Sequence, residues 1–173
     1  ATAITSLIGN DGGIIHIYPS NSYDTLTNLL TITDTTHRLV EIIDFGTVCR
    51  QIRTNNGSAS TNLVKLPNYL PMVINSLLAF IRYSAITTSK DIQHWDTSRV
   101  VDFNSVFRDK TLDFVPDWDY SSATNISSAF DTLTANAGGV NIKTNNVVVL
   151  SGLFSRANLP NTNITIDTPN ATN

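Results

Sequence analysis

The chain has 173 residues, enough for one large or two small domains with a real core. Hydrophobic residues make up 41% of it, but only 14% are charged, against about 25% in a typical soluble domain. The net charge is −3 and the eleven Lys and Arg residues are scattered, so no nucleic-acid partner is expected. No apolar run approaches the roughly 18 residues of a membrane span.

Thr, Asn and Ser together fill about a third of the sequence, where a typical domain carries charges. A surface of hydroxyls and amides is common in extracellular and virion proteins that are rich in β-structure. The single cysteine, Cys49, has no partner for an internal disulfide. Because it lies in an apolar stretch, we interpret it as a small buried hydrophobe rather than a reactive thiol.

The first third of the chain predicts β-structure. Three runs rich in β-branched residues, 14–18, 29–33 and 38–45, are bounded by Gly, Pro or polar residues and are expected to be strands. Residues 53–62 have almost nothing to bury and are expected to be a loop. We therefore expect an N-terminal β-rich unit over residues 1–62.

After residue 62 a spacing recurs. Trp95 is followed at +12 by Phe107, Trp118 by Phe130, and Ile142 by Phe154, and Ile166 begins a fourth frame that has no aromatic. The frames start 23 or 24 residues apart, and the stretch from Leu63 to Phe80, which lies before these frames, fits a divergent repeat that caps the array. A fixed offset on a fixed period indicates a repeat array. We expect about four repeats over residues 63–173, the last incomplete, with the Trp/Ile positions in one column and the phenylalanines in another.

Each repeat has a second segment with apolar residues at i, i+3, i+6 and i+7. In the best-defined repeat these are Val100, Phe103, Val106 and Phe107. That spacing places four side chains on one face of a short helical or 3₁₀ turn. Asp96, Thr97 and Ser98, which lie just before this segment, are expected to cap free backbone amides. The predicted fold class is therefore α+β, with the N-terminal β-rich unit followed by a leucine-rich-repeat-like solenoid of short strands and short helical turns.

The repeat resembles the BspA-like leucine-rich surface repeats of mycoplasma and lactobacillus surface proteins, which also occur in phage and viral proteins. That family's pattern is roughly I-x-x-W-D-T-S-x-V-x-x-M-x-x-M-F, and residues 92–107 fit it. Residues 63–71 look like the family's L-x-x-[LV]-P-x-x-L-P lead-in. The third repeat departs from the pattern, with Ile142 for Trp and Lys143 for Asp. The resemblance implies adhesion, host interaction or surface structure, and it carries no catalytic residues to transfer.

No catalytic, cofactor or metal motif is found in the sequence. An acidic group, which could bind Ca²⁺ if the fold gathered it, is better explained by solvated or capping carboxylates; it consists of Asp113, Asp117, Asp119 and Asp131. Trp95 and Trp118 could form an aromatic ladder for a sugar. Because Ile142 and Ile166 replace tryptophan in the later repeats, buried stacking is the preferred interpretation.

These features predict a non-enzymatic extracellular, cell-surface or virion-surface protein that acts as an adhesion or structural module. Its partner would be a protein or glycan on a host or neighbouring surface. One alternative is a capsid, fibre or filament subunit with a purely structural role. A less favoured alternative is a glycan-processing enzyme, which needs paired carboxylates; Glu41 is the only glutamate in the chain.

The last frame, which starts at Ile166, runs out before its second segment. Such a repeat cannot bury its own face. We therefore expect either that the chain is a piece of a longer polypeptide or that a neighbouring subunit, in a homo-oligomer or another assembly, covers the C-terminal repeat.

Overall fold

The computed structural model describes residues 29–32, 41–42, 45, 51–54, 62–147 and 150–171. The strand expected at 14–18 and Cys49 lie outside these ranges, as does most of the run 38–45. The described residues form six short strands: β1 (Leu29–Ile32), β2 (Gln51–Thr54), β3 (Thr111–Leu112), β4 (Thr134–Ala135), β5 (Gly139–Lys143) and β6 (Asn163–Asp167). β1 falls on the predicted run 29–33, whereas β2 overlaps the start of the stretch expected to be a loop.

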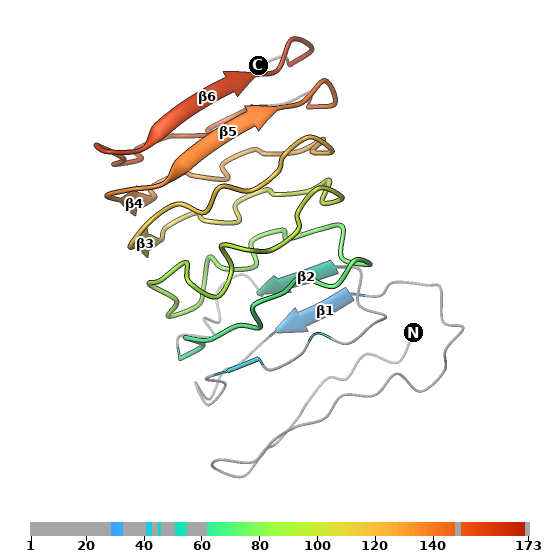
Figure 1. Cartoon of the computed structure of the whole chain (residues 1–173), viewed down its shortest axis with the longest axis vertical. Helices are drawn as coiled ribbons and strands as arrows, with labels where there is room; N and C mark the ends of the chain where they lie inside the picture. Colours follow the sequence, from blue (N-terminus) through green and yellow to red (C-terminus); the bar gives the residue numbers. More distant parts are fainter. Residues whose placement is uncertain are drawn as a thin grey trace.

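The strands pair in parallel as β1–β2, β3–β4 and β5–β6. Leu29 pairs with Gln51, Thr111 with Thr134 and Gly139 with Asn163, so each partner lies about one period further along the chain. Parallel bridges such as Asp102 to Asn125 continue this pattern between the strands. Figure 1 shows the result, a stack of coils with the C-terminus at one end.

We define a coil as one circuit of the chain around this stack. The coils are residues 66–91, 92–114, 115–138 and 139–162, and residues 163–171 begin a fifth. We call the side of the stack that carries β5 and β6 the strand side. We call the side formed by the segments 76–84, 102–110, 125–133 and 150–157 the turn side.

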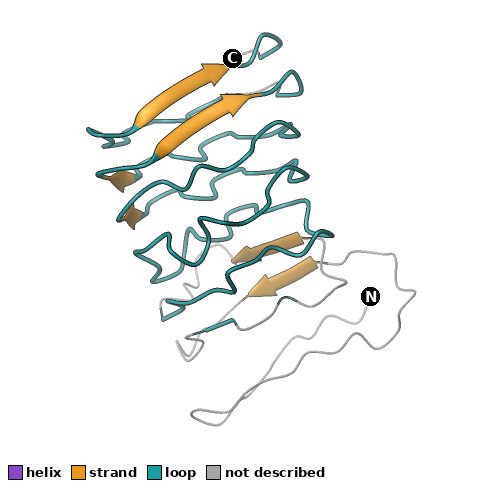
Figure 2. Ribbon diagram, viewed as in Figure 1, coloured by secondary structure: helices purple, strands orange, loops and turns teal. Residues whose placement is uncertain are grey.

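The predicted α+β fold class is wrong, because the described residues contain no helix (Figure 2). They therefore do not form the expected leucine-rich-repeat-like solenoid of strands and short helical turns. The segments expected to be helical are runs of turns. Their apolar residues nevertheless point inward as the spacing requires: Val100, Phe103, Val106 and Phe107 are fully buried.

The hydrogen bonds of the turn side explain why no helix forms. Along residues 103–110, the amides of Phe103, Ser105 and Phe107 donate to the next coil, at Asn125, Ser127 and Ala129 respectively. The amides between them close local turns, as when Val106 donates to the Phe103 carbonyl. A helix requires consecutive amides to bond within the segment. Here every second amide bonds to the neighbouring coil instead.

This backbone requires left-handed residues at regular intervals. Positive φ angles occur in pairs four residues apart, at Ser105 (56°) and Asp109 (59°) and again at Ser128 (54°) and Thr132 (58°). The coil at residues 139–162 repeats the pair at Gly152 (66°) and Arg156 (56°). A left-handed conformation costs a non-glycine residue about 1–2 kcal/mol. The inter-coil hydrogen bonds offset this cost in the inner coils.

The core runs along the axis of the stack and is rich in aromatic rings. It also receives residues from the N-terminal side of the boundary expected at residue 62. Phe45 is buried and meets the ring of Phe80 at 5.8 Å and that of Trp95 at 5.7 Å, both edge-on. Glu41 forms a parallel bridge with Lys65, and the Ile42 amide donates to the Lys65 carbonyl at 3.1 Å.

Candidate functional site

The predicted column positions lie in the interior of the stack, except at its C-terminal end. Trp95 and Trp118 stack face to face, with centroids 5.8 Å apart and planes at 6°. Ile142, one repeat on, is fully buried, and it pairs across β5–β6 with Ile166, which is 44% exposed. Both tryptophans are buried, at 4% and 2% exposure. They offer no surface platform on which a sugar could stack.

The phenylalanine positions form a second row of rings. Phe130 stacks on Phe107 at 5.8 Å and on Phe154 at 5.0 Å, with interplanar angles of 24° and 10°. Phe107 and Phe130 are fully buried, whereas Phe154 is half-buried. The two rows touch where Phe107 meets Trp118 at 4.9 Å.

The indole nitrogens explain why tryptophan suits two of these positions. Trp95 Nε1 donates to the Pro67 carbonyl at 2.9 Å, and Trp118 Nε1 donates to the Ile92 carbonyl at 2.8 Å. Each acceptor belongs to the preceding coil. A buried indole therefore satisfies its donor and also ties adjacent coils together.

The residue two places after each Trp/Ile position points into the stack. Thr97 and Thr144 are buried, and their hydroxyls donate to the carbonyls of Asp119 and Ala123 respectively. Tyr120 takes the same place and packs its ring 4.8 Å from Phe103. Its hydroxyl is buried and has no hydrogen-bond partner. Burial, together with the charge of Asp117, raises the pKa of this phenol.

The aspartates of the motif cap local amides, as predicted, whereas the Thr97 and Ser98 hydroxyls act as donors instead, to the Asp119 carbonyl and to Asp96 Oδ1. Asp96 Oδ1 accepts from the Ser98 hydroxyl at 2.6 Å and the Ser98 amide at 3.1 Å, and these bonds lower the pKa of the Asp96 carboxyl. Asp119 Oδ1 accepts from the Ser121 amide at 2.8 Å. Asp102 and Asn125 make the same two-residue turn on the other side of the stack. Sequence analysis missed this second column, although a polar side chain recurs there at the repeat period.

Of the four aspartates considered as a Ca²⁺ group, Asp113, Asp119 and Asp131 each have their own local partners rather than a common centre. Asp113 accepts from the Thr88 hydroxyl at 2.7 Å and the Ser89 amide at 2.8 Å. These bonds outweigh desolvation and lower the pKa of Asp113. In the described part of the chain no three His, Cys, Asp or Glu side chains are grouped as metal ligands would be. Nor do those residues include a helix long and apolar enough to cross a membrane.

Arginine and aspartate form a ladder of ion pairs along the turn side, which we call the charge ladder. Arg82 pairs with Asp109 at 2.8 Å, Arg108 with Asp131 at 3.1 Å, and Arg156 with Asp131 at 3.2 Å. Desolvation raises the pKa of Asp131, but hydrogen bonds from Thr132 and Arg156 and the nearby guanidinium charges outweigh it, so the pKa is lowered. This ladder was not predicted, because its arginines and aspartates are scattered charges in the sequence.

Lys110 is buried at the edge of the turn side, at 7% exposure. Its Nζ donates to the Ser84 carbonyl at 2.6 Å. Desolvation lowers the pKa of Lys110 to about 8. A lysine in this setting stabilises one backbone carbonyl but pays a desolvation cost for its charge.

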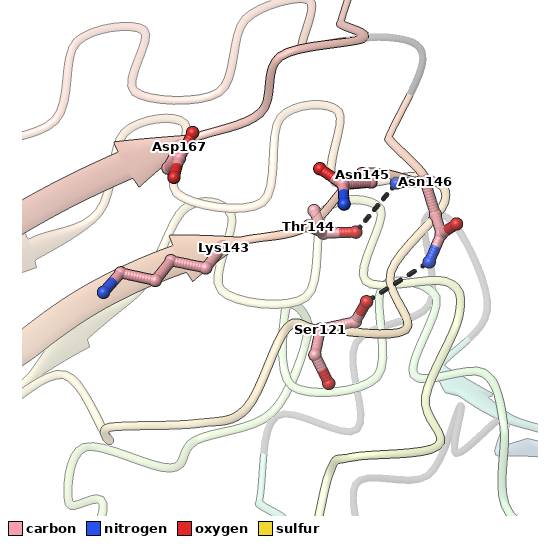
Figure 3. Close-up of a pocket in the computed structure, with 6 residues that line it drawn as sticks. All are labelled: Ser121, Lys143, Thr144, Asn145, Asn146 and Asp167. Atoms are coloured by element: carbon pink, nitrogen blue, oxygen red, sulfur yellow. Dashed lines mark hydrogen bonds between the residues drawn. The ribbon is translucent and has the colours of Figure 1, made fainter.

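A shallow polar pocket of about 390 Å³ lies near the C-terminal end of the described stack. It is lined by Ser121, Lys143, Thr144, Asn145, Asn146 and Asp167. Figure 3 shows Lys143 and Asp167 on neighbouring strands and the asparagines in the turn that follows β5. Asn146 Nδ2 donates to the Ser121 carbonyl at 3.3 Å, which fixes this amide. The pocket offers amides, a hydroxyl and one charge of each sign, a set suited to a neutral polar ligand.

Residues 76–173, more than half of the chain, match the model of a family described as "Mycoplasma protein of unknown function, DUF285". The chain belongs to the DUF285 family. No curated protein and no solved structure matches it. The DUF285 match begins at Ser76, the first residue of the turn-side column of bridges, and includes the charge ladder from Arg82 onward. The expected resemblance is thus confirmed at the level of a mycoplasma protein family.

Proposed function

We propose that this DUF285 protein is a non-enzymatic adhesion or structural module that works at an extracellular, cell or virion surface, and that its repeats are of the BspA-like type. The observation that carries the proposal is the division of roles between the inside and the outside of the stack. Aromatic rings and inter-coil hydrogen bonds hold the axis, while amide, hydroxyl and paired charged groups remain at the surface. Such a stack supports a rigid, extended contact surface.

The polar pocket is the contact point that we favour for a host protein or glycan. Its lining groups can exchange hydrogen bonds with hydroxyls or amides of a ligand, and its opposite charges, Lys143 and Asp167, lie on adjacent strands. No aromatic side chain lines this pocket, so we expect it to bind a sugar weakly one site at a time. Adhesion by such a module would therefore rely on several copies acting together.

Retention on immobilised glycans and on host-cell surfaces tests this proposal. We expect concentration-dependent retention of the protein when several copies are linked together. The double change Lys143→Ala and Asn145→Ala should reduce this retention at least tenfold. The matched control is Lys90→Ala, which removes an exposed charge far from the pocket. Absence of retention on every surface would exclude adhesion.

The competing enzyme hypothesis is tested in the same assay by measuring release of soluble sugar. Glu41, the only glutamate, is paired with Lys65 at 2.6 Å in the described structure. Hydrolysis that persists in the purified protein and is abolished by Glu41→Gln would favour a glycan-processing enzyme over the module proposed here.

A purely structural role as a capsid, fibre or filament subunit is the second candidate. The observation that favours it is the described interior, in which stacked rings and inter-coil hydrogen bonds join each coil to the next. Imaging of the native particle or cell surface with a specific antibody distinguishes a continuous lattice from isolated surface molecules.

A further inference from the structure

A corner turn recurs along the stack just after the Trp/Ile positions, and we call its two central residues the tip. In the coil of residues 92–114, the Val100 amide donates to the Thr97 carbonyl at 2.9 Å. In the coil of residues 115–138, the Ala123 amide donates to the Tyr120 carbonyl at 2.9 Å. The residues that open and close these turns are buried, so the tip between them is held out towards solvent.

The tips of three successive coils are polar. They consist of Ser98 and Arg99, Ser121 and Ser122, and Asn145 and Asn146. The Ser98 hydroxyl donates to Asp96 Oδ1 at 2.6 Å, and Asn146 Nδ2 donates to the Ser121 carbonyl at 3.3 Å. Such residues suit an exposed turn, because their side chains form hydrogen bonds with nearby backbone groups and with water.

The coil of residues 66–91 has an apolar tip instead. Its turn closes where the Ile74 amide donates to the Pro71 carbonyl at 3.0 Å, so Met72 and Val73 are the tip residues. Ile74 is buried, but Met72 is 71% exposed and Val73 is 39% exposed. Tyr69, just before this turn, is 44% exposed. We call Tyr69, Met72 and Val73 the apolar lip. Met72 thus stands where the three coils above carry serine or asparagine.

Met72 has both the chemistry and the access of an oxidation site. It is the only methionine in the chain, and its exposure lets a small oxidant reach the thioether sulfur. The side chains of Trp95 and Trp118, which strong oxidants also attack, are only 4% and 2% exposed. A hydroperoxide therefore finds an open sulfur at this tip, while the rings of the core are covered.

The reaction is a transfer of one oxygen atom. A lone pair of the sulfur attacks one oxygen of the hydroperoxide, so that a sulfur–oxygen bond forms and the oxygen–oxygen bond breaks. The proton of the hydroperoxide ends on the departing oxygen, which leaves as water or an alcohol. The sulfur is oxidised by two electrons and the peroxide is reduced. A dithiol reverses the step through a sulfoxide reductase, becoming a disulfide while the oxygen leaves as water.

The fold accommodates the product, because the place of Met72 is one that polar side chains occupy in other coils. A sulfoxide oxygen accepts hydrogen bonds, as a serine hydroxyl or an asparagine amide does at the other tips. In a core, the same change would place a polar group among apolar side chains. We propose that Met72 is a site of reversible oxidation by hydroperoxides, and that its sulfoxide makes the apolar lip polar while the stack stays folded. This modification site goes beyond the proposed function and does not rest on it.

Site-resolved mass spectrometry of the whole chain after peroxide treatment tests the site. Trypsin releases Met72 in the peptide of residues 66–82, because it cleaves after Lys65 and after Arg82. In dilute hydrogen peroxide at pH 7, this peptide should gain one oxygen atom at a rate within about tenfold of that of free N-acetylmethionine. Treatment of the folded protein with methionine sulfoxide reductases of both stereospecificities and a dithiol should remove that oxygen.

Two variants test the consequence for the surface. Retention of the protein on a phenyl matrix should fall after peroxide treatment and recover after reduction. Met72→Leu keeps Cys49 and every other oxidisable group, and its retention should not change with peroxide. Met72→Gln places an amide at the tip, as in the polar coils, and should elute early without any peroxide. The urea midpoints of the untreated, oxidised and Gln proteins should agree.

Four outcomes would overturn the proposal. Oxidation of Met72 slower than the expected range would mean that the sulfur is covered. A urea midpoint lowered by oxidation would mean that the sulfoxide disrupts packing. A sulfoxide that the reductases leave in place would exclude reversibility. An equal change of retention in Met72→Leu would assign the effect of peroxide to another group.

Discussion

At the scale of the residue, the interior contains polar groups that cost stability as well as groups that add it. Thr97 and Thr144 bury hydroxyls that donate to the carbonyls of a following or preceding coil. Tyr120 places a larger ring at the same position, gains contacts with Phe103 and Phe130, and leaves its hydroxyl without a partner. A buried unsatisfied hydroxyl costs about 1–3 kcal/mol.

Tyr120→Phe should therefore leave the free energy of unfolding unchanged or raise it by about 1 kcal/mol, since the ring contacts remain and the unpaired hydroxyl is removed. Urea unfolding followed by circular dichroism measures the difference. Tyr120→Ala is the matched control and should destabilise by about 3–5 kcal/mol. A loss above about 1 kcal/mol in the Phe variant would show that the hydroxyl has a partner, such as a buried water.

Lys110 makes stability depend on pH. Its folded pKa of about 8 lies below the ordinary value of 10.5, so between these values the unfolded chain binds the proton and the folded chain does not. Stability should therefore rise with pH from about 8 towards 10, by up to roughly 3 kcal/mol. Below pH 8 both states carry the proton and the cost of burying the charge is present in full.

Lys110→Met should abolish this rise and should increase stability at pH 7 by about 1–3 kcal/mol, because the charge is replaced by a side chain of similar volume. Urea titrations at pH 7, 8, 8.5 and 9 compare the two proteins. If the free energy of unfolding rises equally with pH in both proteins, a group other than Lys110 titrates in this pH range.

At the scale of the element, the close approach of neighbouring coils restricts side chains at one glycine. Gly138 has φ +112°, and a Cβ added there would lie 2.2 Å from the Val115 carbonyl oxygen and 2.6 Å from its nitrogen. Gly139, next to it, has only Asp117 side-chain atoms near its Cβ position, at 3.9 Å or more. The Val115–Gly138 bridge therefore requires glycine on one side.

Gly138→Ala should destabilise the protein by at least about 3 kcal/mol, since both the contact and the backbone conformation oppose a side chain. Gly139→Ala is an internal control and should change stability by less than about 1 kcal/mol. Thermal and urea unfolding of the two variants provide the comparison. Similar stabilities for the two variants would show that the coils can move apart at the Val115–Gly138 bridge without a loss of stability.

Sequence analysis predicted the residues of the core well and the backbone of the turn segments poorly. The spacing of Val100, Phe103, Val106 and Phe107 correctly places these side chains inside. It does not distinguish a helix from a turn run, because both place i, i+3 and i+7 on one face. The difference lies in where alternate amides donate, which depends on a neighbouring coil. The charge ladder and the shallow pocket likewise join residues about one period apart, so their contacts follow only from the inter-coil register.

At the scale of the whole molecule, the stacked rings connect the coils into one core. Phe130 lies between Phe107 and Phe154 and also meets Tyr120 edge-on at 6.2 Å. Phe130→Ala should cost about 3–5 kcal/mol through lost burial and the cavity left behind. Phe154→Ala removes a ring that is only half-buried, and it should cost less than half as much. Urea midpoints measured at the same m-value test this order, and equal losses would mean that Phe154 is covered in solution.

The inter-coil hydrogen bonds of the turn side run in one direction, because each described coil donates amides to the coil that follows it. Inserting or removing one whole period between inner coils therefore keeps the same hydrogen-bond pattern, and each extra coil contributes one more layer of contacts. A gene encoding such a protein can lengthen or shorten it by entire periods without redesigning either boundary, so related proteins should differ in reach in steps of one period.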